Sequence, residues 1–430
     1  MLHRARAPLR PPLLGRRRPG GHLGRRRAGR ARRRQRHARA PRRRRPAGGD
    51  RALSTLERRA RELLAEEPGG SGAAVASAAA PGRCTLVGEH VDYAGGMVLC
   101  CPVDRAVAVA LRPSGDGRWR LVSDGRRVER GTPRPAGDLG DRAFAPAVVL
   151  AEEGIALPAL EMAVAADLPE AAGLASSAAL CCAATLAMLR LAGARMPTGR
   201  FVEVALAAER DVVGVPCGPL DQAAVVGLPA GGALLLDCGR GSADMVPWHL
   251  ETAVLVACDS GEAHDVGGAG YRERRAEAEA ALLALGATSV GRLEPCDVLT
   301  ARLPAPLDRR ARHLVSETHR AATAAAALAA GDAVTLGALM SASHASLRDD
   351  YEVSTPSLDA AVAAALGVPG CLGARMVGAG FGGTAIALVG GPAAKAVLAA
   401  MEASVPRSRG GWLLAHAPGL AVTATDVLEG

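Results

Sequence analysis

At 430 residues the chain is too long for a single ordinary core, so two domains of about 150 to 200 residues each are expected. Hydrophobic residues make up 49% of the sequence but aromatic residues only 2%, which argues against stacking platforms for single-stranded nucleic acid. The formal charge of +9 belongs to residues 1–50, which hold 19 Arg and one Asp, whereas residues 51–430 carry −9, so we do not expect the globular part to bind nucleic acid.

The first segment, residues 1–50, consists mainly of Arg, Pro, Gly and Ala. Such a segment repels itself and cannot bury a core, so we expect a disordered tail. Three origins are open: a targeting peptide, a nucleic-acid-binding arm, or the translated extension of a GC-rich reading frame. The lack of Ser in the tail argues against the first, and the use of a single Lys (Lys395) in an Arg-rich chain favours the third.

The elements after the tail mix helix and strand. An amphipathic helix is predicted from Arg51 through Leu53, Leu56, Leu63 and Leu64. Three short strands of one sheet are predicted next, at Cys84–Val87, Met97–Val103 and Arg105–Leu111. Further helices are expected at 174–191, 199–213, 271–285, 309–330, 358–366 and 393–403, and further strands at 232–238, at 253–259 and on both sides of a Gly-rich turn within 374–389. The mixed order with hairpins predicts an α+β fold in two layers rather than a doubly wound sheet.

Three Gly-rich or small-residue segments are candidates for binding phosphate. A P-loop is excluded, because it needs a Lys after its last Gly and the single Lys, Lys395, follows no such loop. The run from Gly378 to Gly383 matches GxGxxG, but a strand follows it where a dinucleotide fold needs a helix, so it is interpreted as a tight turn or a plain hairpin. The run from Leu168 to Ala179 puts Ser176 and Ser177 at the start of a helix, where they either bind an anion or simply cap the helix.

A dense polar cluster lies between apolar strands, at Arg83, Glu89, His90 and Asp92. Carboxylates accept hydrogen bonds from sugar hydroxyls, and Arg and His donate them, so the cluster is typical of a site for a polyhydroxylated ligand. A solvated loop would have the same composition. Both interpretations remain open on these residues alone.

The segment from Pro81 to Gly96, which contains this cluster, resembles the galactokinase signature of the GHMP kinases. Five further segments resemble motifs of the same family in the same order: 169–179, 214–222, 259–275, 343–354 and 378–383. The resemblance implies a GHMP kinase with an N-terminal domain like ribosomal S5 domain 2 (51–230), a C-terminal ferredoxin-like domain (231–430) and the active site in the cleft between them. It also implies transfer of the γ-phosphoryl group of ATP to the anomeric hydroxyl of a galactose-like sugar.

The resemblance further implies a role for each matching residue. Asp221 would be the base that takes the proton from the sugar, supported by Arg83, which also neutralises charge on the phosphoryl group. The sugar would be held by Glu89, His90, Asp92, Gly218 and Tyr271. ATP would be bound at Gly173, Leu174, Ser176, Ser177 and Ala178. Mg²⁺ would be held by Ser177 and Glu209, and the site shaped by Gly380, Gly382 and Gly383.

The chain departs from the family pattern at a few positions. In the second motif, P-x-G-x-G-L-S-S-S, Ala171 replaces the first Gly and Ala175 the first Ser. Beside the sugar residues, Val91 and Ala94 replace a common Thr and Asn. The alternatives left open are therefore a kinase for another sugar, such as N-acetylgalactosamine or an arabinose-like pentose, and a non-enzymatic sugar sensor.

Other features bear on partners and compartment. The ten Cys form no CxxC pair, which fits reduced thiols, and charged residues interrupt every long apolar stretch. We therefore expect a cytoplasmic protein that does not bind a membrane. We also expect a monomer.

Overall fold

The computed structural model describes residues 48–68, 75–169, 172–227, 232–262, 268–408, 410–414 and 427–428. Within the chain, Pro46–Gly430 forms one compact unit. The predicted tail at residues 1–50 lies almost wholly outside the described residues, and the first helix, α1 (Gly48–Glu66), starts at its expected end.

The larger sheet has seven strands, in the order β4-β3-β5-β2-β7-β8, with β1 paired to β2. Its strands are β1 (Ala76–Val87), β2 (Met97–Pro113), β3 (Trp119–Ser123), β4 (Arg126–Arg130), β5 (Leu160–Ala166), β7 (Gly232–Asp237) and β8 (Ser242–Pro247). Its described pairings are antiparallel except for β3 with β5. The mainly antiparallel pairing, with helices packed against the faces of the sheet, confirms the α+β prediction.

Strand β2 runs unbroken for 17 residues, so the prediction of two separate strands at 97–103 and 105–111 is wrong. The charged pair Asp104–Arg105 has the composition of a turn. However, β1 pairs with β2 from Leu99 to Leu111, and β5 and β7 pair with successive parts of β2. A turn in the middle would break these hydrogen-bonded ladders, so the backbone stays extended.

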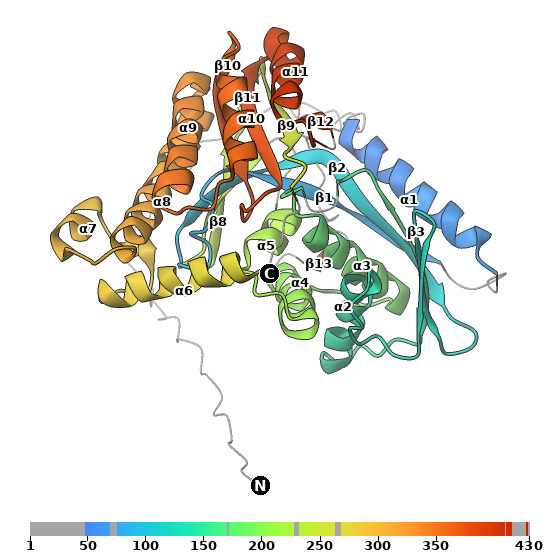
Figure 1. The fold of residues 1–430 in the computed structure, drawn as a ribbon. Coiled ribbons are helices and arrows are strands. Elements are labelled where there is room, and N and C mark those ends of the chain that lie inside the picture. The colour runs from blue at the N-terminus through green and yellow to red at the C-terminus, as the bar shows by residue number, and fades with distance from the viewer. Residues whose placement is uncertain are drawn as a thin grey trace, which may run out of the picture. The chain divides into compact units, whose positions relative to one another are not determined.

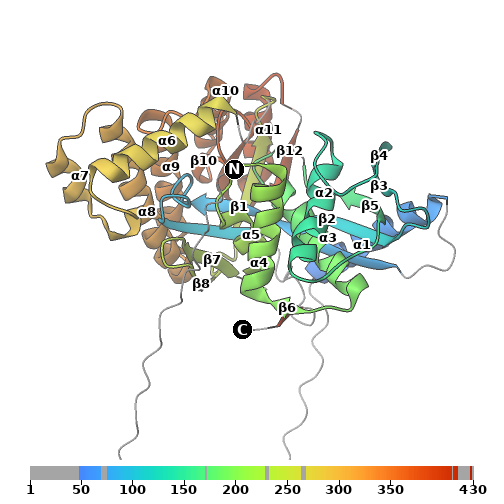
Figure 2. The ribbon, with the colours of Figure 1, turned by 90° about the horizontal axis from the view of Figure 1, so that it is seen from below.

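Helices cover both faces of this sheet (Figures 1 and 2). One face carries α2 (Gly140–Glu152), α3 (Ser176–Ala192), α4 (Thr198–Ala207), a π-helical segment (Ala208–Val213) and α5 (Leu220–Gly227). Helix α1 lies on the opposite face, where Leu56, Ala60 and Leu64 pack against alanines of the strands. The central strands are buried on both faces, and for this reason they read as apolar runs rather than as alternating patterns.

The smaller sheet is antiparallel, with the order β10-β11-β9-β12. Its strands are β9 (Ala253–Asp259), β10 (Cys371–Val377), β11 (Thr384–Gly390) and β12 (Gly411–Leu414). The helices of this half are α6 (Ala269–Ala284), α7 (Pro295–Ala301), α8 (Leu307–Ala330), α9 (Ala333–Asp349), α10 (Pro356–Leu366) and α11 (Ala394–Ser404). Helix α8 also packs against β1, β2 and β8 of the larger sheet. A short parallel pair joins β6 (Met196–Pro197) to β13 (Val427–Leu428).

The larger sheet extends past the predicted domain boundary at residue 230. Strands β7 and β8 follow that position in sequence but pair with β2 and with each other. A division of the chain by sheets therefore falls between Pro247 and Ala253, and the extent of the two domains stays a proposal.

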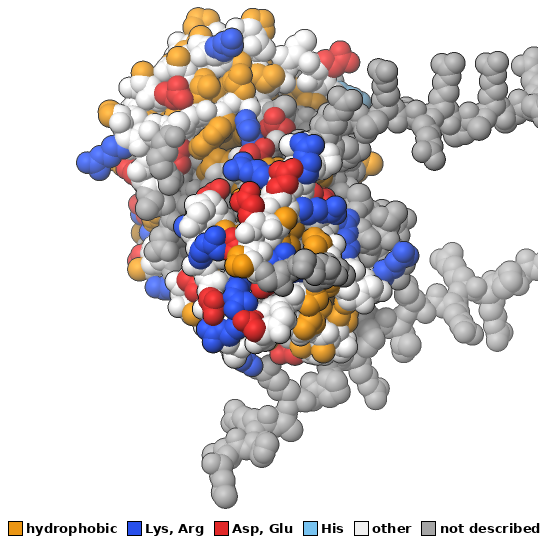
Figure 3. Space-filling model, turned by 90° about the vertical axis from the view of Figure 1, so that its right-hand side faces the viewer, with side chains coloured by type: hydrophobic (Ala, Val, Ile, Leu, Met, Phe, Trp, Pro, Cys, Tyr) orange, Lys and Arg blue, Asp and Glu red, His pale blue; other side chains and the backbone are white. Residues whose placement is uncertain are grey.

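The surface around α1 and the β3–β4 hairpin mixes both signs of charge (Figure 3). On the hairpin, Arg118 and Arg120 both form ion pairs with Glu129. Opposite charges at short range cancel at a distance, so this face is not a basic surface of the kind that attracts nucleic acid. Within the described ranges, no helix combines the length and the apolar character needed to cross a membrane.

Candidate active site

A pocket of about 680 Å³ lies between the larger sheet, helices α3 and α5, and the turn that joins β10 to β11. Most of the predicted site residues line it: Arg83, Glu89, His90, Asp92, Gly173, Ser176, Ser177, Glu209, Gly218, Asp221 and Tyr271. The remaining predicted residues are not among its lining. Leu174 and Ala178 are buried in the core, and Gly380, Gly382 and Gly383 lie further along the turn than Gly378 and Ala379, which do line it.

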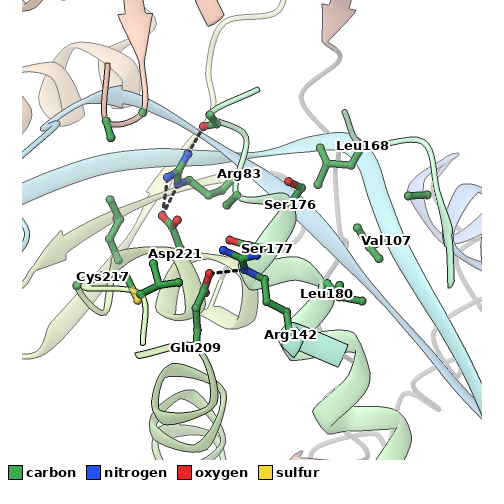
Figure 4. Close-up of a pocket in the computed structure, with 18 of the residues that line it drawn as sticks. Arg83, Val107, Arg142, Leu168, Ser176, Ser177, Leu180, Glu209, Cys217 and Asp221 are labelled. Atoms are coloured by element: carbon green, nitrogen blue, oxygen red, sulfur yellow. Dashed lines mark hydrogen bonds and ion pairs between the residues drawn. The ribbon is translucent and has the colours of Figure 1, made fainter. Parts of the chain in front are cut away.

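An ion pair between Arg83 and Asp221 stands at the centre of the pocket (Figure 4). Arg83 follows a register irregularity in β1 between Pro81 and Arg83, a device that re-aims a side chain near active sites. Its Nε and Nη2 donate to the same oxygen, Oδ1 of Asp221, at 2.8 and 2.5 Å, and its Nη1 donates to the carbonyl of Gly173 at 2.6 Å. The Arg83 side chain is buried, whereas Asp221, at the start of α5, stays 29% exposed. The carboxylate is therefore held on one oxygen and accessible from the pocket.

One end of the pocket is formed by the loop after β1. Glu89 is buried, and its Oε1 accepts a hydrogen bond from the backbone N–H of Gly378 at 2.7 Å. His90, at φ 64°, bonds through Nε2 to the carbonyl of Ala379 at 3.0 Å and through Nδ1 to the hydroxyl of Tyr93 at 2.9 Å. Burial raises the pKa of Glu89. The loop thus presents polar groups that are already oriented by their partners.

Aromatic rings gather around His90. The chain has three tyrosines, and all three lie close to this ring: the centroids of Tyr93, Tyr271 and Tyr351 are 6.0, 5.8 and 4.9 Å from it. The hydroxyls of Tyr93 and Tyr351 are 2.9 Å apart. Sequence reasoning found only Tyr271. The scarcity of aromatic residues in the chain was the signal that could have indicated the other two.

Asp92 and Gly218 lie in direct contact at this end. A Cβ on Gly218 would lie 2.1 Å from Oδ2 of Asp92, so a side chain at position 218 would displace the carboxylate. Burial, and then repulsion from Asp221, raises the pKa of Asp92 to about 6. Asp92 therefore changes charge near neutral pH.

The turn between β10 and β11 closes this end from the smaller sheet. All four of its glycines have positive φ, from 77° to 128°, at positions 378, 380, 382 and 383. A Cβ on Gly380 would lie 2.3 Å from the carbonyl of Val353, so the turn packs too closely for another residue there. The interpretation as a tight turn between two strands is confirmed, and no helix follows it.

The other end of the pocket is the N-terminus of α3. Its N-cap residue is Ala175, at φ 61°, and no side chain caps the helix. Ser176 and Ser177 are the first helical residues and line the pocket, so the alternative that a Ser caps this helix is wrong. An uncapped N-terminus leaves backbone donors and the positive end of the helix dipole for an anion. Ala171, the other departure in this motif, lies outside the described residues.

A buried carboxylate adjoins this helix terminus. Glu209, in the π-helical segment, is only 3% exposed and hydrogen-bonds with Ser177. Nε of Arg142 donates to its Oε1 at 3.2 Å (Figure 4), and Nε2 of Gln222 donates to its Oε2 at 2.8 Å. Burial raises the pKa of Glu209. Sequence reasoning missed Arg142, whose place on α2 gives no local signal that it reaches Glu209.

The chemistry of these donors fits Mg²⁺. Among the described residues, no group of three or more His, Cys, Asp or Glu side chains could hold a metal by itself. Mg²⁺ does not require such a cage, because it is commonly held by one or two carboxylates together with substrate phosphates and waters. Glu209 and Ser177 supply that kind of partial site.

An apolar wall completes this end of the pocket (Figure 4). It is formed by Val107, Leu139, Val164, Leu168 and Leu180. Ser123, Asp124 and Arg126 of the β3–β4 hairpin line the pocket as well. Apolar walls beside a few placed polar groups are typical of sites for small molecules.

Comparison with protein families finds three matches along the chain. The GHMP kinases N terminal domain matches residues 142–227, and the GHMP kinases C terminal domain matches residues 324–407. The galactokinase galactose-binding signature matches residues 66–113, which contain Arg83 and the loop after β1. The three matches fall in the order that the sequence motifs predicted.

Comparison with individual proteins gives relatives over most of the chain. A galactokinase of Roseiflexus sp. is 42% identical over 322 residues, which cover 72% of this chain and 82% of the relative. A galactokinase of Homo sapiens is 35% identical, with 80% and 89% covered. Among solved structures, Lactococcus lactis galactokinase complexed with galactose has a TM-score of 0.78 at 30% identity and covers 85% of this chain and 98% of its own. L. major mevalonate kinase, at 21% identity and a TM-score of 0.60, covers 80% and 96% and shares the fold.

Proposed function

This chain belongs to the galactokinase family of GHMP kinases, and we propose that it transfers the γ-phosphoryl group of ATP to the anomeric hydroxyl of galactose. One observation carries the proposal. A single pocket is lined by the polar loop after β1, the Arg83–Asp221 ion pair and the uncapped N-terminus of α3. A sugar at the first, a base at the second and phosphates at the third give the arrangement that phosphoryl transfer requires.

In this mechanism Asp221 accepts the proton of the attacking hydroxyl. Arg83 holds one carboxylate oxygen, so the other is free to accept from the sugar. Because Arg83 is buried and cannot lose its charge, it also stabilises negative charge that develops on the transferring group. Alignment and charge stabilisation supply most of the rate in such reactions.

At the phosphate end, Ser176, Ser177 and the backbone N–H groups of α3 would bind the phosphates, with Gly173, Leu174 and Ala178 contributing backbone only. Ser177 and Glu209 would hold Mg²⁺, which neutralises charge on the phosphate oxygens when it is bound. Arg142 would add a second positive charge beside Arg83. The apolar wall would accept the adenine ring.

The sugar would be bound by Glu89, His90, Asp92 and Tyr271, with Gly218 leaving space for Asp92. The two departures beside these residues do not argue against galactose. Val91 and Ala94 are buried, at 0% and 3% exposure, and neither is among the residues that line the pocket. They therefore alter the core under the loop rather than the groups that face a ligand.

The test is an assay of ADP release from Mg·ATP with a panel of sugars. Galactose is expected to be phosphorylated with a kcat/KM well above that for glucose, N-acetylgalactosamine and arabinose. ATP binding without turnover of any sugar would instead support a sensor. A higher kcat/KM for N-acetylgalactosamine or arabinose would replace galactose as the substrate.

We also propose a monomeric, cytoplasmic enzyme. All ten cysteines are free thiols in the structure, and most are buried, which fits a reducing compartment. Light scattering of the purified protein and fractionation of cells test the two statements separately.

A further inference from the structure

The sugar loop, defined here as residues Gly88–His90, is held by helix α8 of the other half of the chain. Its backbone makes two hydrogen bonds to α8. The N–H of Gly88 donates to Oε1 of Glu317 at 2.8 Å, and the carbonyl of Glu89 accepts from Nε2 of His313 at 3.1 Å. His313 and Glu317 are four residues apart, so both side chains project from the same face of the helix. Neither residue is among those that line the pocket.

Glu317 is fixed in place by two other side chains. Its side chain is 0% exposed. Oγ of Ser343 donates to its Oε1 at 2.5 Å, and Nε of Arg320 donates to its Oε2 at 2.8 Å. Burial alone would raise the pKa of Glu317, but the charges of Arg320 and Arg375 outweigh it and hold the value at about 2. The acceptor for Gly88 is therefore a fixed, ionised carboxylate at every pH at which a kinase works.

His313 is equally constrained. It is 0% exposed, and its Nδ1 lies 2.9 Å from Oγ of Ser346 on α9. Because the carbonyl of Glu89 can only accept, Nε2 must carry the hydrogen. Burial lowers the pKa of His313 to about 4, so the ring is neutral and keeps this tautomer at neutral pH.

The sugar loop needs such restraints. His90 has φ 64°, a conformation that costs a non-glycine residue free energy and persists only where the surroundings enforce it. Burying a charged side chain also costs desolvation free energy, and an apolar residue in its place is often as stable or more stable. A buried charge therefore indicates a function beyond stability. Glu317 does not line the pocket. Its contact toward the pocket is the hydrogen bond from the N–H of Gly88, and this bond gives the buried carboxylate a function in the sugar loop.

We propose that Glu317 and His313 are positioning residues that keep the sugar loop in the conformation that binds sugar. This inference rests on the proposed function, in which Glu89 and His90 of the loop contact galactose. Helix α8 then links the smaller half of the molecule to the sugar specificity of the larger half.

The proposal predicts how the kinetic constants divide. If the loop adopts its sugar-binding conformation for only a fraction of the time, the apparent affinity for sugar is the intrinsic affinity multiplied by that fraction. Saturating sugar shifts the whole population to the sugar-binding conformation, so kcat changes little. ATP binds at the other end of the pocket, so its KM should not move. A purely structural role would lower stability without this pattern.

The experiment compares Glu317→Ala and Glu317→Gln with Leu328→Ala. Leu328 is a matched control, because it lies on the same helix, is 0% exposed and packs in the core away from the loop. Glu317→Ala is expected to raise the galactose KM and Kd about tenfold or more, with the ATP KM within about twofold. Glu317→Gln keeps an oxygen that can accept from Gly88 and should restore part of the loss. Leu328→Ala should lower the melting temperature and leave both KM values unchanged.

Hydrogen exchange of the peptide that contains residues 88–90 gives a second readout that needs no substrate. Exchange there should be faster in Glu317→Ala than in wild type and unchanged in Leu328→Ala. If Glu317→Ala does not fold, Ser343→Ala removes one donor to the same carboxylate, and a galactose Kd about threefold higher is expected.

The outcomes separate the two proposals. A galactose Kd within twofold of wild type and unchanged exchange in Glu317→Ala would overturn the positioning role, even if the enzyme is a galactokinase. If wild type neither binds nor phosphorylates galactose, the proposed function fails. The exchange result then still decides whether Glu317 orders the loop.

Discussion

The two ends of the pocket are prepared for their ligands in different ways. At the sugar end, Glu89 already accepts hydrogen bonds from the N–H of Gly378 and from His313 of α8, and His90 donates to the carbonyl of Ala379. At the phosphate end, the N-terminus of α3 has no capping side chain, and Arg142 is paired with Glu209. At the first end the polar groups are already oriented by partners within the protein. At the second end the backbone donors and the charges have no such fixed arrangement, and a polyanion would bring them together.

The charge of the ligand explains this difference. A protein distinguishes neutral sugars by hydrogen bonds, and an acceptor that is out of place contributes little binding free energy. A triphosphate is attracted by cations and dipoles over a longer range, so exact placement before binding matters less. Glu209 would help to hold Mg²⁺, and Arg142 beside it would add positive charge for the phosphates.

Asp221 lies where the two ends meet, so its substitution should have the largest effect. Asp221→Asn keeps an oxygen for Arg83 but cannot take a proton, and kcat should fall about 100- to 10,000-fold. Galactose and ATP should still bind, as measured by calorimetry. Asp211→Asn is the control, because Asp211 forms an exposed pair with Arg210. A kcat within tenfold of wild type would mean that Asp221 is not the base.

Gly218→Ala tests how rigid the sugar end is. The new Cβ would collide with Oδ2 of Asp92, so the galactose KM should rise about 10- to 100-fold, while the ATP KM stays the same. The matched control is Gly199→Ala on α4, where a Cβ would meet nothing within 4 Å. If Gly218→Ala binds galactose normally, the carboxylate of Asp92 is mobile and the sugar end is not set in advance.

Arg142→Ala tests the opposite end. Loss of one cation beside the phosphates should raise the ATP KM and the Mg·ADP dissociation constant about tenfold, with the galactose Kd unchanged. Arg142→Lys should recover part of this loss. Arg200→Ala, on an exposed ion pair with Glu153, serves as the control. An Arg142→Ala enzyme with weaker galactose binding and normal nucleotide binding would contradict the division of the pocket.

The effect of pH on galactose binding should be no larger than that of Arg142→Ala. Asp92 has a pKa of about 6, so it is ionised above that value and can accept from sugar hydroxyls. As pH falls through 6, Asp92 becomes protonated, and the galactose Kd measured without ATP should rise about tenfold between pH 7 and pH 5. Asp92→Asn should bind more weakly and lose this dependence. A flat profile in wild type would show that the charge of Asp92 is not used.

Much of the candidate site could be identified from the sequence because its residues occur in short, ordered motifs. Arg83, Glu89, His90 and Asp92 are conspicuous in an apolar context, and the structure brings them into one pocket with Asp221. Arg142 and Glu317 could not be found in the same way. Each contacts a partner more than 60 residues away, and no local pattern encodes such contacts.

The fold was predicted well where periodicity is strong and less well elsewhere. Helix α8 and strand β9 lie where expected, at Leu307–Ala330 and Ala253–Asp259. Helix α9 was missed, because its sequence contains Gly337 and three serines that weaken a helical pattern. Several of these small residues face tight contacts: a Cβ on Gly337 would lie 2.2 Å from the carbonyl of Leu372. Tertiary packing, rather than propensity, decides the structure there.

The hydrogen bonds from α8 and from the β10–β11 turn also determine when the sugar loop can reach its final conformation during synthesis of the chain. The ribosome makes residues 88–90 early, but their partners His313, Glu317, Gly378 and Ala379 come much later. The larger sheet can pair before that point, since its last strand ends at Pro247. A nascent chain, or one cut short by a premature stop codon before Gly378, would therefore contain the whole signature of the sugar site and still lack a finished one.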